Sequence, residues 1–210
     1  MVNRRSTGKV VELKAQGARA RLREAIEQRT LVRLWRSGLE AGSFTGYVAA
    51  VGREFFLIWT VGDYIGFDGL YALRHRDVTE LEAPDASAGF IEKAMALKNV
   101  VPEFPGDWDL DSAEGVVRSA CAMRAVVAVH VDTEGPSEIC FVGRLLDHEP
   151  EGFMLQEITP DAEWLREGSF FGYDEISAVA VASPYNEALE MVAGVTPDDV
   201  QPARDQGAKQ

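Results

Sequence analysis

Hydrophobic and polar positions alternate along two long stretches of the chain, and this pattern predicts two sets of short β-strands. Turns that contain glycine or other polar residues separate the apolar runs. The first set comprises residues 31–35, 44–51, 55–61, 70–74 and 78–81. The second comprises residues 125–131, 139–146, 153–158, 170–173 and 176–181. A segment of roughly 50 residues with five strands is too short for a two-layer sandwich of ordinary size. Each set therefore predicts a small, strongly bent barrel, which removes the sheet edges.

The two stretches also align with each other, which indicates an internal duplication. Gly46 aligns with Gly143 and, after one inserted residue, Phe55 aligns with Phe153. Two copies of a long period favour two related small domains over a solenoid, which needs about three units. A glycine within a strand predicts a sharp bend or a close backbone approach. We therefore expect Gly46 and Gly143 to shape the two barrels.

Helical patterns surround the two barrels and complete a mainly β, α+β organisation. Residues 10–28 predict a helix within a basic arm, and residues 185–192 predict a short C-terminal helix. The expected units are a basic helical arm (1–30), a first barrel (31–84), a helical connector (85–123), a second barrel (124–184) and a C-terminal helix with a disordered tail (185–210).

The connector predicts two helices separated by prolines. The first follows Ser87 and is expected to bury one apolar side. Its members are Phe90, Ile91, Ala94, Met95 and Leu97. The second is expected to begin at Asp111, with Glu114 completing a capping box.

Charge is distributed unevenly along the 210 residues, whose net charge is −13. Residues 1–30 hold eight Lys or Arg and three Glu, so a basic arm precedes an acidic body. Such an arm either binds nucleic acid or docks, as a solvated helix, on the acidic body. The second alternative is favoured because the arm has no aromatic residue to stack on bases. Twelve acidic residues against three Arg in the second barrel would also repel phosphates, so a nucleic-acid partner is not expected.

The apolar runs are too short for a membrane span, and the N-terminal residues do not resemble an export signal. A cytoplasmic protein without membrane contact is therefore expected. Cys121 and Cys140 are interpreted as buried free thiols, because a chain with a normal core does not need a disulfide.

Residues with catalytic potential are few, so no catalytic residue, cofactor or metal ligand is predicted. His75, His130 and His148 have no partner at metal-ligand spacing. His148 lies near Glu149 and Glu151, where a surface metal site competes with the favoured interpretation of a plain polar hairpin.

Two further features have both a functional and a structural interpretation. Asp77 and Glu175 occupy equivalent positions of the repeats, either as paired acids or, as favoured here, as caps of the turn before each last strand. Trp164 lies in a loop expected at 160–168 and is the best candidate for an exposed contact surface.

The segments Phe141–Leu145, Tyr173–Ser177 and Pro184–Leu189 are similar to a family of uncharacterised bacterial proteins, and each repeat resembles the Sm-like (SH3-like) small barrel. The resemblance covers about residues 31–193 and implies assembly through strand edges. RNA binding, known in some branches, is not carried over, because the Arg-Gly pair before the last strand is absent.

The sequence therefore predicts a non-enzymatic binding or assembly module with a protein partner or self-association. The sequence does not indicate whether the protein binds a small molecule. The alternatives are an enzyme with its site in the groove between the barrels, or an RNA-associated protein that acts through the arm.

Overall fold

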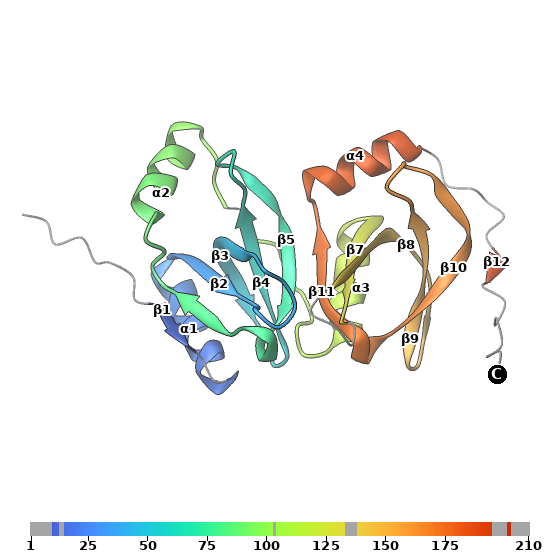
Figure 1. Cartoon of the computed structure of the whole chain (residues 1–210), viewed down its shortest axis with the longest axis horizontal. Coiled ribbons are helices and arrows are strands. Elements are labelled where there is room, and N and C mark those ends of the chain that lie inside the picture. The colour runs from blue at the N-terminus through green and yellow to red at the C-terminus, as the bar shows by residue number, and fades with distance from the viewer. Residues whose placement is uncertain (1–9, 13–14, 103, 133–137, 195–200, 203–210) are drawn as a thin grey trace, which may run out of the picture.

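The computed structural model describes residues 10–12, 15–102, 104–132, 138–194 and 201–202. Its strands are β1 (Val10–Glu12), β2 (Leu31–Trp35), β3 (Ser43–Val51), β4 (Phe55–Val61), β5 (Phe67–Arg74), β6 (Glu80–Glu82), β7 (Val126–Val131), β8 (Ile139–Glu149), β9 (Gly152–Ile158), β10 (Trp164–Gly172), β11 (Ile176–Val181) and β12 (Gln201–Pro202). Its helices are α1 (Ala15–Gln28), α2 (Ala88–Leu97), α3 (Ala113–Met123) and α4 (Pro184–Ala193), with short 3₁₀ helices η1 (His75–Asp77) and η2 (Tyr173–Glu175). The predicted mainly β organisation with helical connectors is confirmed (Figure 1).

All strands belong to one sheet, in the order β1-β6-β2-β3-β4-β5-β11-β7-β8-β9-β10-β12. We call residues 31–84 the first repeat and residues 124–184 the second repeat. Both have the same internal order, with the last strand beside the first, and both place a 3₁₀ helix before the last strand. The pairing among the described strands is linear and does not close a ring within either repeat, so the expected closed barrels are not what the sheet pairing shows.

The two repeats are joined by strand pairing and by a common core. β5 of the first repeat pairs antiparallel with β11 of the second, from Ala178 opposite Leu73 to Val181 opposite Leu70. The largest cluster of buried residues contains Phe55 and Leu57 of the first repeat, Phe153 of the second, and Val116 of α3. The repeats therefore share buried apolar area and form a single body.

The glycines within strands lie where two backbones come close together, as predicted. A Cβ atom on Gly46 would lie 2.0 Å from the Trp59 carbonyl oxygen, and one on Gly143 would lie 2.1 Å from the Gln156 carbonyl oxygen. Only a residue without a side chain allows β3 to approach β4, and β8 to approach β9, at these points.

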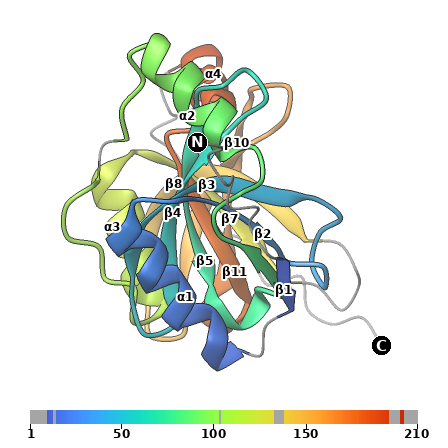
Figure 2. The same ribbon diagram turned by 90° about the vertical axis from the view of Figure 1, so that its left-hand side faces the viewer.

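Helix α1 packs on the first repeat through Ala18, Leu22 and Ala25, all of which are buried (Figure 2). The part of the basic arm that forms α1 thus packs on its own chain through apolar side chains, which is one of the arrangements that the favoured interpretation allowed. The prediction that this helix begins at residue 10 is wrong. Residues 10–12 form β1 and pair with β6, and the helix begins at Ala15.

The other helices form close to their predicted positions, but the buried face of α2 is narrower than predicted. In α2, Ile91 and Met95 are buried whereas Phe90 and Leu97 are 68% and 77% exposed, because only one side of this short helix meets the first repeat. The N-cap of α3 is Ser112 rather than Asp111; its hydroxyl accepts a hydrogen bond from the Gly115 N–H at 3.1 Å.

Both cysteines are free thiols, as predicted, but the expectation of burial is wrong for Cys140, which is exposed, and Cys121 is half-buried. The residues before Ser6 and most of the C-terminal tail, for which disorder was predicted, lie outside the described residues. Within the described ranges, no helix has both the length and the apolar character needed to cross a membrane.

Candidate functional site

A cavity of about 670 Å³ lies where the two repeats meet, and we call it the junction cavity. Its charged lining residues are Arg19, Arg53, Glu54, Arg74, Arg76 and Asp174. Its other lining residues are Phe55, His75, Ala113, Tyr173 and Ile176. The first repeat and α1 supply most of the charged groups, whereas the second repeat and α3 supply an apolar wall. The volume lies within the roughly 300–1,000 Å³ that is typical of small-molecule sites.

The 3₁₀ helices place unlike side chains on opposite sides of the junction cavity. η1 contributes His75 and Arg76, and η2, at the equivalent position of the second repeat, contributes Tyr173 and Asp174. Both 3₁₀ helices precede the last strand of their repeat, and the last strand β11 pairs with β5, which leads into η1. The pairing of the repeats thus brings two equivalent turns, with different chemistry, to one cavity.

Arg74 is held at the end of β5 by carboxylates from both repeats. Its Nε donates to Asp77 Oδ2 at 2.6 Å, and its Nη2 donates to Asp132 Oδ2 at 2.9 Å. The residue is 5% exposed, and its third nitrogen, Nη1, is buried without a hydrogen-bond partner in the described part of the chain. The same is true of Arg19 Nε and of His75 Nδ1. Arg74 Nη1 and Arg19 Nε are donors on residues that line the cavity, and because buried polar groups are normally hydrogen-bonded, a polar ligand could satisfy them after small side-chain movements.

His75 lies beside these arginines as a neutral imidazole. Burial lowers its pKa, and the charges of Arg19 and Arg23 lower it further, while the Gly52 and Phe55 carbonyl groups oppose the change. Its Nε2 lies 3.2 Å from the Gly52 carbonyl oxygen, which can only accept a hydrogen bond, so Nε2 is the protonated nitrogen.

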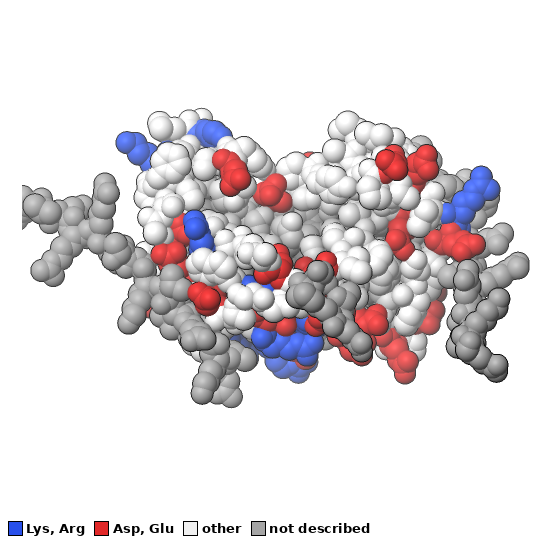
Figure 3. Space-filling view, viewed as in Figure 1, with Lys and Arg blue, Asp and Glu red and all other residues white. Residues whose placement is uncertain are grey.

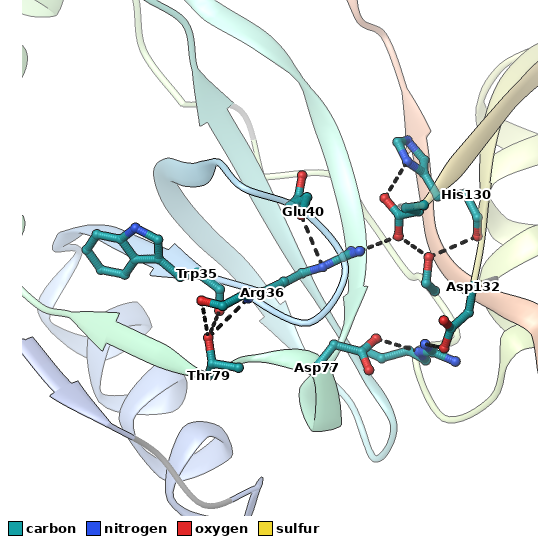
Figure 4. A network of polar contacts seen from close by, with 11 residues as sticks. Trp35, Arg36, Glu40, Asp77, Thr79, His130 and Asp132 are labelled. Atoms are coloured by element: carbon teal, nitrogen blue, oxygen red, sulfur yellow. Dashed lines mark hydrogen bonds and ion pairs between the residues drawn. The ribbon is translucent and has the colours of Figure 1, made fainter. Parts of the chain in front are cut away.

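A second polar cluster joins the repeats on another side of the junction (Figure 4). Arg36, which follows β2, is 0% exposed; its Nη2 pairs with Glu138 of the second repeat and its Nε lies 3.3 Å from Glu40. The Glu138 carboxylate also receives a hydrogen bond from the Ser177 hydroxyl and contacts His130 Nδ1 at 2.8 Å. We call these five residues the Arg36 network.

The charges of the Arg36 network support one another. Burial would raise the pKa of Glu138, but the contacts with His130, Arg36 and Ser177 outweigh it and lower this pKa to about 2. Burial would likewise lower the pKa of His130, but its contacts with Cys140 and Glu138 raise this pKa to about 9. Near neutral pH the pair is therefore an imidazolium and a carboxylate.

The Arg36 network makes a testable prediction about pH. The contribution of Glu138 is complete above its ordinary pKa of 4.5 and is lost as the pH falls through about 2. The contribution of His130 is complete below its ordinary pKa of 6.5 and is lost as the pH rises through about 9. We expect the difference in unfolding free energy between the natural chain and His130→Gln, measured by urea titration, to be greatest from pH 4.5 to 6.5. A difference that does not vary with pH would contradict the predicted coupling.

The Arg36 network has the residue types of a hydrolase triad but not the geometry. A nucleophilic serine must give its proton to an adjacent base. Here the Ser177 hydroxyl donates to the Glu138 carboxylate, and His130 Nδ1 contacts the same carboxylate. The hydroxyl also donates to the His130 backbone carbonyl at 3.1 Å. These contacts fix the Glu138 carboxylate within the second repeat, where it pairs with Arg36 of the first.

The predicted candidate residues lie apart from one another. Asp77 holds Arg74, and Glu175 Oε2 accepts the Gly172 N–H at 3.2 Å, so each acid stabilises the turn before a last strand, as favoured. His148 Nδ1 lies 3.0 Å from the Tyr173 hydroxyl. Among the residues that the structure describes, no group of three or more His, Cys, Asp or Glu is placed to hold a metal ion.

Trp164 differs from its prediction. It begins β10 instead of lying in a loop, it is half-buried against the cluster beneath α4, and its indole N–H donates to the Gly194 carbonyl at 3.3 Å. The expectation that Trp164 lies in a loop is therefore wrong, and a contact surface at this half-buried residue stays a prediction. The sequence-based predictions did not include the junction cavity residues, although the first repeat carries Arg74-His75-Arg76 where the second carries Gly172-Tyr173-Asp174.

Comparison with known proteins does not place the chain in a family. No family model matches it, and no curated protein matches it. Among solved structures, it is similar at 13% identity to MrkH, described as a c-di-GMP-dependent transcription regulatory factor, over 77% of this chain and 66% of that chain, with a TM-score of 0.18. A structure of K. pneumonia MrkH in its apo state is 9% identical over 85% and 86% of the two chains, with a TM-score of 0.15. Likenesses this weak do not establish a common fold.

Proposed function

We propose that this protein is a non-enzymatic binding module whose small-molecule ligand occupies the junction cavity. The proposal rests on one observation: the residues that line the junction cavity come from α1, from α3 and from both repeats. Such a site depends on the pairing of the repeats, and its mixture of apolar side chains with convergent polar groups is typical of ligand pockets.

The proposal is tested by filling the junction cavity. Ala113 lines the cavity at the start of α3, whereas Ala122 is exposed on the same helix, so Ala113→Trp and Ala122→Trp are matched variants. A panel of charged and neutral small metabolites is screened by thermal unfolding. A ligand at 100 times its Kd stabilises the folded state by about 2.7 kcal/mol, which raises the Tm by about 5–10 °C for a chain of this length.

We expect at least one compound to raise the Tm of the natural chain and of Ala122→Trp, but not that of Ala113→Trp. Circular dichroism spectra that match the natural chain establish that both variants fold. A Tm shift that persists in Ala113→Trp, or a panel without any stabilising compound, would reject the junction cavity as the binding site.

We also propose that each repeat is an Sm-like (SH3-like) unit. Two observations support this proposal: the strand order is the same in both repeats, with the last strand beside the first, and a 3₁₀ helix precedes that last strand.

Self-association is a second candidate function, favoured by the pairing of β5 with β11. That contact joins the fourth strand of one repeat to the last strand of the other. The two equivalent strands lie near the ends of the sheet. The last strand of the first repeat, β6, pairs there with the short strand β1, and the fourth strand of the second repeat, β10, pairs with the short strand β12. A second copy could pair β10 with β6 in place of these short strands, because a strand edge accepts any matching backbone.

Removal of the short edge strands tests this second candidate. A chain shortened to residues 13–194 is expected to form dimers or larger species at concentrations where the full chain does not, measured by light scattering after size-exclusion chromatography. A shortened chain with an unchanged circular dichroism spectrum that remains as monomeric as the full chain would disprove assembly through these edges.

A further inference from the structure

We infer that the ligand of the junction cavity is a phosphorylated small molecule with an apolar or aromatic body. This inference rests on the proposed binding function and names the class of ligand. It comes from the charge of the lining, from the buried nitrogens that lack partners, and from the apolar part of the lining.

Arginines gather at the junction cavity of a chain whose net charge is −13. Four arginines and two acidic residues line it, and because Arg74 is paired with Asp77 and Asp132, the positive charge there comes from Arg19, Arg53 and Arg76. Figure 3 shows Asp and Glu side chains scattered over one face of the molecule, with Lys and Arg gathered densely only along its lower edge. Local positive charge in an acidic chain favours an anion at that place over anions elsewhere on the surface.

The arginines approach from four segments of the chain. Arg19 comes from α1, Arg53 from the turn between β3 and β4, and Arg74 and Arg76 from the end of β5 and from η1. A phosphate group presents several oxygens in different directions and can accept from several guanidinium groups at once. A single carboxylate offers two oxygens, so the number of converging arginines favours phosphate.

The buried nitrogens show that some donors near the junction cavity are not satisfied by the protein. Arg74 is 5% exposed, and Asp77 and Asp132 occupy only its Nε and Nη2. Arg74 Nη1 and Arg19 Nε are both buried without a partner among the described residues. A buried donor without a partner is unfavourable, and oxygens of a bound phosphate would satisfy these two donors after small side-chain movements.

The rest of the lining suits an organic group. Ala113 of α3 and Ile176 of the second repeat are apolar, Tyr173 adds a ring whose hydroxyl group contacts His148, and Phe55 adds apolar surface from the first repeat. A cavity of about 670 Å³ holds considerably more than a phosphate ion. The remaining volume accommodates a body of about the size of one or two rings. Burial of the apolar area of such a body favours binding, by roughly 25 cal/mol per Å².

Three probes separate the parts of this inference: 1-naphthyl phosphate, 1-naphthol and glycerol 3-phosphate. Titration calorimetry measures their binding to the full chain. We expect 1-naphthyl phosphate to bind at least about tenfold more tightly than 1-naphthol, which corresponds to one charge-assisted hydrogen bond. We also expect it to bind more tightly than glycerol 3-phosphate, which lacks a ring.

Matched variants assign the binding to the arginines. Arg53 and Arg76 have side chains that are 65% and 66% exposed, so Arg53→Gln/Arg76→Gln is expected to fold, as checked by its Tm. This double variant should weaken the binding of 1-naphthyl phosphate about tenfold or more. Arg166→Gln, a change of the same kind at an exposed position of β10, should alter it by less than about twofold.

The outcomes distinguish this inference from the proposed function. If 1-naphthol binds as tightly as its phosphate, and Ala113→Trp removes that binding, the junction cavity is a binding site but the ligand class is wrong. If phosphate-dependent binding is equally weakened by Arg166→Gln, it reflects surface charge and overturns the inference. If none of the three probes binds, the assignment of a phosphorylated ligand is rejected, while the metabolite panel decides the proposed function separately.

Discussion

Replacing Arg36 with methionine is expected to lower the free energy of unfolding by about 3–5 kcal/mol. The Arg36 side chain is 0% exposed and pairs with Glu40 of its own repeat and with Glu138 of the second repeat. Methionine fills a similar volume but leaves both carboxylates without their shared cation. Burial already raises the pKa of Glu40 despite the Arg36 charge. Because His130 still compensates Glu138, the loss should lie nearer 3 than 5 kcal/mol. Urea unfolding followed by circular dichroism measures it.

A surface arginine supplies the matched control for this change. Arg118 pairs with Glu114 at 2.9 Å on α3, where both side chains are about half exposed (54% and 48%). Because solvent screens such a pair, Arg118→Met should cost at most about 1 kcal/mol. Adding Glu40→Gln to Arg36→Met should restore part of the lost stability, since it removes the carboxylate that has lost its cation. Equal losses for Arg36→Met and Arg118→Met would show that the Arg36 network does not stabilise the junction.

Strand positions could be predicted well because their signal is local. Residues 31–35, 55–61 and 176–181 were predicted as strands and form β2, β4 and β11 with those same bounds. In each run, β-branched and aromatic side chains fill a buried face, so the pattern needs no knowledge of distant contacts. β10 was predicted to begin at 170 rather than at Trp164, because the exposed polar residues Arg166 and Glu167 hide the strand pattern in its first half.

The contacts between the repeats could not be predicted, because they join residues far apart in the sequence. Arg36 follows a strand within a turn that contains glycine, and such a position usually holds a solvated charge. Its burial depends on Glu138, 102 residues away, which lies opposite only because β5 pairs with β11. Alternation along a strand shows which face is apolar but not which strand edge lies beside it.

The junction cavity had a partial signal in the sequence. Aligned residues that are alike in the two repeats, such as Gly46 and Gly143, maintain the backbone, whereas aligned residues that differ identify surfaces the repeats do not share. Arg76 and Asp174 differ in this way, and both line the junction cavity. The sequence could indicate that these turns had diverged, but their convergence on one cavity follows from the order of the strands.

Replacing Gly143 with alanine is expected to destabilise the fold by about 3 kcal/mol or more. The new Cβ would lie 2.1 Å from the Gln156 carbonyl oxygen and 3.0 Å from the Glu157 Cα, which are main-chain atoms and cannot rotate away. β8 would have to move away from β9, which would break the hydrogen bonds of their pairing near Gly143 and Glu157. Urea unfolding measures the loss where the variant is soluble, and the soluble yield measures it otherwise.

Gly46→Ala and Gly38→Ala separate this steric effect from the general cost of a substituted glycine. A Cβ on Gly46 would meet the Trp59 carbonyl oxygen at 2.0 Å, whereas one on Gly38 would meet nothing within 4 Å. We therefore expect Gly46→Ala to be as damaging as Gly143→Ala, and Gly38→Ala to change stability by no more than about 0.5 kcal/mol. If Gly143→Ala proved as mild as Gly38→Ala, the close approach of β8 and β9 would be wrong. Matched losses at Gly46 and Gly143 would instead indicate that one steric requirement shapes both repeats, and through them the junction where the cavity forms.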